Sequence, residues 1–227
     1  MMSSPEEFYE YRLKGKSAAE ILAVIRYLKR EINSLIKTLE HPDYVCEICP
    51  SEEVQLMCNR EYLSVAKHAL AEAGGMYKPT RSELKAMAFE ENVPYISRVV
   101  LSVGGFTMGY DKRVAEISDD QVHLFAEKFP ISDGPEELTH DLTKTEFLDF
   151  IRGLHIGEWR RNYDLYRYGM AVMDGVQWEL TLNFSNGHKA VTYRGDNAYP
   201  CNFKKLLELL DLGLDDECQE YFESNEN

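Results

Sequence analysis

The chain has 227 residues, and its 39 acidic and 25 basic side chains give a formal net charge of −14 and an isoelectric point near 4.9. Hydrophobic residues make up 44% and charged residues 28%, a balance typical of folded globular proteins, which excludes collagen-like, coiled-coil and low-complexity chains. This length suits one large domain or two small ones and can bury a core without disulfides or metals.

The first 92 residues are predicted to form a helical layer of about three helices. Ser17 and Glu20 have the spacing of a capping box, in which each side chain bonds the backbone N–H of the other residue at a helix start. The apolar residues that follow, at spacings of three and four, are typical of a helix packed against another helix. They are Ile21, Ile25, Leu28, Ile32, Leu35 and Leu39.

Two further helices are expected in this layer. One should start at Ser51, before two acidic residues, and end at the glycines 74 and 75, because acids favour a helix start and glycine favours a helix end. The other should start at the capping box of Thr80 and Glu83 and end before Pro94.

At residue 95 the pattern changes to one of strands. Residues 95–103 are apolar and β-branched, and they are predicted to pair with residues 106–110 through a tight turn at Gly104 and Gly105. Two more capping boxes, Ser118–Gln121 and Thr143–Glu146, predict helix starts.

The clearest strand is residues 177–184, where apolar and polar side chains alternate between two Asx-Gly turns at 174–175 and 186–187. A two-residue type I′ turn at 186–187, with positive φ at both residues, fixes the register of the next strand. The predicted cross-strand pairs are Phe184 with Lys189, Leu182 with Val191 and Leu180 with Tyr193. A last helix should be capped by Asn202 and end at Gly213, with Phe203, Leu206, Leu207 and Leu210 facing inward.

The sequence therefore predicts an α+β fold: an N-terminal helical layer packed on an antiparallel sheet built from hairpins, followed by a C-terminal helix. Residues 1–92 are expected to form the helical layer and residues 93–227 the α+β unit, within one compact structure. We expect no membrane span, because no apolar stretch approaches about 20 residues, and no signal peptide, because the N-terminus lacks an apolar core.

Five cysteines are an odd number, which favours reduced thiols and a cytoplasmic location. Cys46, Cys49, Cys58 and His68 contain the elements of a zinc site. Cys58 and His68, however, are ten residues apart within one predicted helix, so they lie about 15 Å apart along its axis. We therefore expect no metal and no cofactor, with a redox role for Cys46 and Cys49 as the alternative.

Acidic residues gather in two segments. Residues 115–149 hold ten acids and two lysines, and residues 208–227 hold eight acids and no base. This concentration disfavours direct nucleic-acid binding, which depends on Lys and Arg, and favours a basic protein partner. The carboxylates proposed for such a partner are Asp215, Asp216, Glu217, Glu220 and Glu223. The alternative is that both segments are solvated faces that aid solubility.

In residues 159–168 bases and aromatic rings interleave, which suits stacking on nucleobases or binding of an acidic peptide. The candidate binding residues are Trp159, Arg160, Arg161, Tyr163, Tyr166, Arg167 and Tyr168. The favoured interpretation is a half-exposed strand whose tyrosines cover the sheet while its arginines pair with the acidic segment 115–149.

The segments 154–159, 174–180 and 195–203, with the elements D-G-x-x-W-x-L and G-x-N-A-Y-P-x-N-F, resemble a region found in a family of uncharacterised bacterial proteins. The resemblance covers about 50 residues of the C-terminal third and implies a bacterial cytosolic origin but no activity. Asn197 and Tyr199 in these elements are further binding candidates, although they fit a sheet-building role equally well.

No complete catalytic motif is present, so no catalytic residue is assigned. The expected function is a non-enzymatic cytoplasmic binding protein, of an immunity or inhibitor type, that engages a protein partner through an acidic surface. The alternatives are an enzyme with a site between the sheet and the 195–202 loop, and a polynucleotide mimic that inhibits a nucleic-acid enzyme. The oligomeric state has no signature in the sequence.

Overall fold

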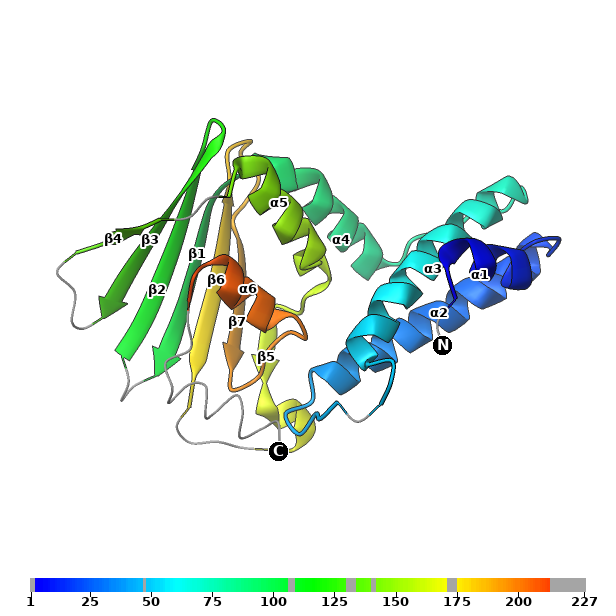
Figure 1. Cartoon of the computed structure of the whole chain (residues 1–227), viewed down its shortest axis with the longest axis horizontal. Coiled ribbons are helices and arrows are strands. Elements are labelled where there is room, and N and C mark those ends of the chain that lie inside the picture. Colours follow the sequence, from blue (N-terminus) through cyan, green and yellow to red (C-terminus); the bar gives the residue numbers. More distant parts are fainter. Residues whose placement is uncertain are drawn as a thin grey trace. The chain divides into compact units, whose positions relative to one another are not determined.

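The computed structural model describes residues 3–46, 48–105, 109–129, 134–139, 142–170 and 175–212. Within these residues the chain divides into two compact units, one up to Pro79 and one from Thr80 onward. We call residues 3–79 the helical unit and residues 80–212 the sheet unit (Figure 1). In the part of the chain that the structure describes, no helix is long and apolar enough to cross a membrane.

The helical unit consists of α1 (Pro5–Arg12), α2 (Ala18–Leu39) and α3 (Glu52–Glu72). The predicted capping box of Ser17 and Glu20 starts α2, and Ser51 caps α3. Helix α1 was not expected from the sequence; a further capping box, formed by Ser4 and Glu7, starts it. The unit has its own core, formed by Phe8, Leu13, Ile21, Ile25, Leu28, Tyr62, Ala66, Ala69 and Leu70.

The sheet unit contains a seven-stranded sheet in the order β4-β3-β2-β1-β6-β7-β5. The strands are β1 (Ile96–Gly105), β2 (Gly109–Ser118), β3 (Gln121–Phe129), β4 (Glu136–Leu138), β5 (Asn162–Asp164), β6 (Gln177–Phe184) and β7 (Val191–Asp196). All neighbours are antiparallel except β5 and β7, which are parallel. Together with the helices, this sheet confirms the predicted α+β class.

Helices α4 (Arg81–Asn92), α5 (Lys144–Gly153) and α6 (Phe203–Leu209) cover one face of the sheet (Figure 1). Short 3₁₀ helices lie at Val93–Tyr95, Ile156–Glu158 and Leu165–Tyr168. Helix α4, which the sequence analysis assigns to the N-terminal layer, belongs to the sheet unit because its Phe89 is buried in the same core as Leu180 of β6. We call the opposite face of the sheet, on which the described residues of the sheet unit place no helix, the open face.

The predicted alternation of β6 is confirmed. Trp178, Leu180 and Leu182 are buried against the helices, whereas Gln177 and Glu179 are on the open face. The ladder to β7 pairs Leu182 with Val191 and Leu180 with Tyr193, as predicted. The inward residues of α6 are also confirmed, since Phe203, Leu206, Leu207 and Leu210 are buried.

The prediction of a type I′ turn at 186–187 is wrong. Gly187 has a positive φ of 80° but Asn186 does not, and the ladder ends at Leu182 and Val191, so Phe184 is not paired with Lys189. The reason is a pair of bonds to the segment that precedes β1: the N–H of Ser185 donates to the oxygen of Tyr95 at 2.8 Å, and the amide of Asn186 donates to Asn92 at 2.8 Å.

The predicted turn at Gly104 and Gly105 is also wrong, because both glycines lie within β1 and pair with Tyr110 and Gly109. A Cβ on Gly104 would overlap the backbone of Gly109, so glycine permits the close approach of β2. The return strand is confirmed from Gly109 onward, and residues 106–108 lie outside the described residues.

Ser118 and Gln121 do not cap a helix. They pair with each other at the tight turn between β2 and β3, where Asp119 has a positive φ of 47°. Asn202 precedes α6 but does not cap it, because its amide donates to the backbone oxygen of Leu154. The capping boxes at Thr80 and Thr143 are confirmed.

Candidate functional site

The aromatic rings of the 159–168 segment belong to the core. Trp159 and Tyr163 are 5% and 3% exposed. Their rings pack on Trp178 at centroid distances of 6.3 and 5.7 Å, and Trp159 also lies 5.7 Å from Tyr193. These two side chains therefore serve the packing of the sheet unit, and Tyr163 also lines the groove described below.

The arginines of this segment stack on tyrosines of the same unit. The guanidinium carbons of Arg160 and Arg161 lie 4.5 and 4.9 Å from the ring centres of Tyr163 and Tyr193. Arg161 also donates to the backbone oxygen of Thr192 at 3.1 Å. Two of the three predicted basic residues, Arg160 and Arg161, are therefore held by cation–π contacts with buried tyrosines.

The rest of the segment is not the strand that we expected. Only β5 is a strand, and Tyr166, Arg167 and Tyr168 lie in the following 3₁₀ helix. The guanidinium of Arg167 lies 5.8 Å from the ring centre of Tyr168, and Tyr166 is 77% exposed. Tyr166 is thus the most accessible of the predicted aromatic residues.

Tyr193 and Lys85 both contact Trp159 of this segment. Burial raises the pKa of Tyr193 to about 12, with the nearby Arg161 acting in the opposite direction. The ammonium of Lys85 donates to the backbone oxygen of Trp159 at 3.0 Å, and burial, followed by the charge of Arg161, lowers the pKa of Lys85. At neutral pH Tyr193 is therefore a neutral phenol of the core.

Asn197 connects the start of β6 with the end of β7. It is 6% exposed, its side-chain oxygen accepts from the N–H of Val176 at 2.9 Å, and its own N–H donates to the oxygen of Val176 at 2.9 Å. The indole N–H of Trp178 donates to Ala198 at 2.9 Å, and a Cβ on Gly195 would overlap this indole. The elements that resemble the bacterial family therefore bond to each other and build the sheet.

Tyr199 packs on Phe203 with a centroid distance of 5.1 Å and belongs to the same assembly. The acidic candidates Asp215, Asp216, Glu217, Glu220 and Glu223 lie outside the described residues, as does the turn at Asp174.

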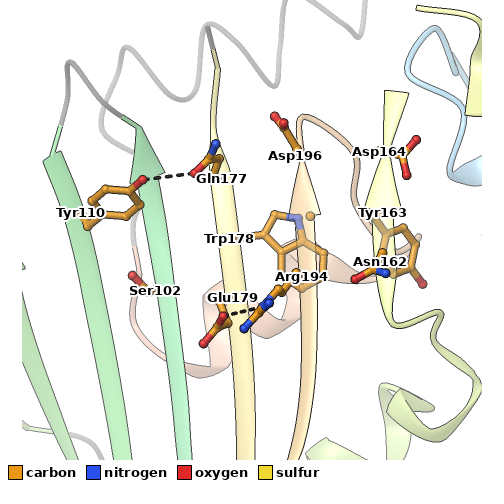
Figure 2. Close-up of a pocket in the computed structure, with 11 residues that line it drawn as sticks. Ser102, Tyr110, Asn162, Tyr163, Asp164, Gln177, Trp178, Glu179, Arg194 and Asp196 are labelled. Atoms are coloured by element: carbon orange, nitrogen blue, oxygen red, sulfur yellow. Dashed lines mark hydrogen bonds and ion pairs between the residues drawn. The ribbon is translucent and has the colours of Figure 1, made fainter. Parts of the chain in front are cut away.

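The structure contains a groove on the open face that the sequence did not reveal as a site (Figure 2). It has a volume of about 530 Å³ and is lined by residues of β1, β2, β5, β6 and β7. This volume lies within the usual range of ligand pockets, about 300 to 1,000 Å³.

Strand register arranges the groove residues in two neighbouring rows. One row contains Ser102, Glu179, Arg194 and Asn162, and the other contains Gly104, Gln177, Asp196 and Asp164. Because Gly104 has no side chain, Tyr110 of β2 reaches Gln177, to which its hydroxyl donates at 3.2 Å (Figure 2). The two aspartates are direct register partners on adjacent strands, which lie about 4.8 Å apart.

Most carboxylates of the open face are neutralised by ion pairs across strands. Glu116 pairs with Arg98 at 3.3 Å and Glu127 with Lys112 at 2.8 Å. In the groove, Glu179 pairs with the Nε of Arg194 at 2.6 Å.

Asp164 and Asp196 differ from these carboxylates. Asp164 accepts from the backbone N–H of Arg167 at 3.3 Å, and Asp196 accepts from the amide of Asn197 at 2.8 Å. Within the described ranges neither aspartate has an ion-pair partner, and both are exposed. The groove therefore has negatively charged residues on two neighbouring strands, each of which a cation can reach.

Sequence reasoning named Asn197 and Tyr163 as binding candidates, which the structure buries within the sheet unit, and it missed the groove. The alternation of β6 already places Gln177 and Glu179 on the open face, and this signal was available. The parallel pairing that brings Asp164 beside Asp196 involves only three residues of each strand and leaves no periodic signal.

No group of three or more His, Cys, Asp or Glu side chains that could hold a metal occurs among the described residues. Cys46 and Cys49 are exposed free thiols, and the absence of zinc remains a prediction. Comparisons with protein-family models, with curated proteins and with solved structures find no match for this chain.

Proposed function

We propose that this chain is a non-enzymatic binding protein that engages a protein partner by seating a cationic group of that partner in the groove of the open face. The observation that carries the proposal is the register pair of Asp164 and Asp196. Among the described residues these two have no counter-ion, whereas the other carboxylates cited on this face are ion-paired. The net acidity of the chain favours a basic partner in the same way.

The binding free energy expected from one such ion pair is modest. A cation about 4 Å from a carboxylate gains about 1 kcal/mol in bulk water and about 4 kcal/mol at the effective dielectric constant near a protein surface. Two such carboxylates therefore give specificity and faster association, and the remaining affinity must come from other contacts of the partner.

The cytoplasm is the proposed location, and the bacterial family of the resemblance is the proposed origin. Support for the location comes from the cysteines, because Cys46, Cys49 and Cys58 form no disulfide within the described part of the chain. Reduced cysteines are usual in a reducing compartment.

The test is an NMR titration of the ¹⁵N-labelled chain with trilysine. Wild type should show shifts confined to the groove, and Asp164→Asn/Asp196→Asn should lose them. Glu116→Gln/Glu127→Gln is the matched control, because it removes the same charge from the same face outside the groove. Equal shifts in the aspartate variant and in wild type would contradict the proposal.

A further inference from the structure

We infer that the cation seated in the groove is the free α-amino group of a peptide chain rather than a lysine or arginine side chain. This inference rests on the proposed function and names the chemistry of its ligand. The reason lies in the row next to the aspartates, which offers donors as well as a carboxylate.

Arg194 has donor capacity to spare. It bonds Glu179 through its Nε, and in the described part of the chain its two terminal nitrogens form no other hydrogen bond or ion pair. The guanidinium group is a planar fork with five N–H donors, so these nitrogens can bind a carbonyl oxygen without releasing Glu179.

Asn162 adds an amide on the neighbouring strand β5. It is the register partner of Arg194, it is exposed, and its side chain has no hydrogen bond to other described residues. The groove thus places two carboxylates in one row and two sets of N–H donors in the next (Figure 2).

The spacing of the rows distinguishes the two kinds of cation. Arg194 and Asp196 are two residues apart on β7, so their Cα atoms are about 6.6 Å apart. In an N-terminal residue the ammonium nitrogen lies about 3 Å from the carbonyl oxygen of the same residue, since only Cα and the carbonyl carbon separate them.

With a hydrogen bond of about 2.9 Å at each end, an N-terminal residue can bridge the two rows. A lysine ammonium is four methylene groups further from its backbone carbonyl. It can contact the aspartates, but in an extended side chain its own carbonyl then lies away from Arg194 and Asn162. The same holds for an arginine side chain. A chain terminus is therefore the cation that brings an acceptor of its own nearest to the donors of the first row.

The groove is accessible to the terminus of a large protein. Asp164, Arg194 and Asp196 are all exposed, so the first residue of an extended partner can contact them while the rest of that partner stays outside.

The experiment is an NMR titration of the wild-type chain with three small probes. Each probe ends in an uncharged amide and carries at most one positive charge. Glycylglycine amide has the α-amino group, N-acetylglycylglycine amide lacks it, and Nα-acetyllysine amide has only the side-chain ammonium. Glycylglycine amide should bind at least tenfold more tightly than Nα-acetyllysine amide and should shift the resonances of Asn162, Arg194 and Asp196, whereas the acetylated dipeptide should cause no shift.

Arg194→Lys keeps the charge and removes the fork, so it should weaken glycylglycine amide several-fold and leave Nα-acetyllysine amide unchanged. Arg98→Lys, on the same face outside the groove, is the control. If both cations bind wild type equally, the inference is overturned and the proposed function stands. If neither binds, both are overturned.

Discussion

Replacing Asn197 by alanine should destabilise the sheet unit, because three features of this residue contribute to the fold. Its side-chain oxygen is the acceptor for the buried N–H of Val176, its amide bonds Asp196, and its φ of 51° lies in the left-handed region. Alanine provides neither bond and is disfavoured at positive φ.

The magnitude follows from these terms. A buried N–H without a partner costs about 1 to 3 kcal/mol. The left-handed conformation adds roughly 1 kcal/mol for alanine relative to asparagine. The bond to Asp196 is partly exposed and contributes little. Asn197→Ala should therefore lower the free energy of unfolding by about 2 to 4 kcal/mol.

The two terms are separable. Asn197→Gly loses the same bonds but accepts a positive φ, so it should be about 1 kcal/mol more stable than Asn197→Ala. Urea denaturation followed by tryptophan fluorescence is the appropriate assay, because Trp159 and Trp178 both lie in the core of the sheet unit. Stability of Asn197→Ala within 0.5 kcal/mol of wild type, on the order of ordinary surface substitutions, would refute the reasoning.

Three further predictions concern other parts of the chain. Gly187→Val should destabilise by more than about 1 kcal/mol, because Gly187 has a φ of 80°, whereas Gly153→Val, also in open space but without a positive φ, should not. Burial raises the pKa of Glu90, so its ionisation opposes folding; Glu90→Gln should raise the free energy of unfolding at pH 7. This gain in stability should disappear at a pH below 4.5, the ordinary pKa of a glutamate carboxyl. An equal gain at pH 7 and at that lower pH would contradict the raised pKa of Glu90. Purified protein should contain far less than one zinc per chain and keep its helical circular dichroism in a chelator; a full equivalent of zinc would contradict the interpretation of Cys46 and Cys49.

Local patterns predicted the helices well. The stripe of α2 and the capping boxes at Ser17, Thr80 and Thr143 depend on residues within one or two turns, and the structure confirms them. Helix α1 was missed because it buries only Phe8 and has little apolar periodicity, although its capping box was readable.

The errors occurred where a distant segment competes with a local preference. Ser118 has the chemistry of a helix cap, yet pairing of β2 with β3 recruits it into a turn. Asn186 would accept a type I′ turn, but its amide bonds Asn92, far away in the sequence. The cross-strand pairs of β6 and β7 were correct because the burial of Leu180 and Leu182 fixes the face regardless of the turn.

The elements that resemble the bacterial family separate into two sets on opposite faces of the sheet. Trp178, Gly195 and Asn197 bond to each other or to their neighbours and are buried, so they explain why such elements would occur together in a fold. Glu179 and Asp196 lie on the open face, where Glu179 pairs with Arg194 and Asp196 accepts from the amide of Asn197. A chain with the buried set would share the sheet, whereas it would share the proposed ligand only if it also placed a carboxylate opposite Asp196 and a guanidinium two residues before it.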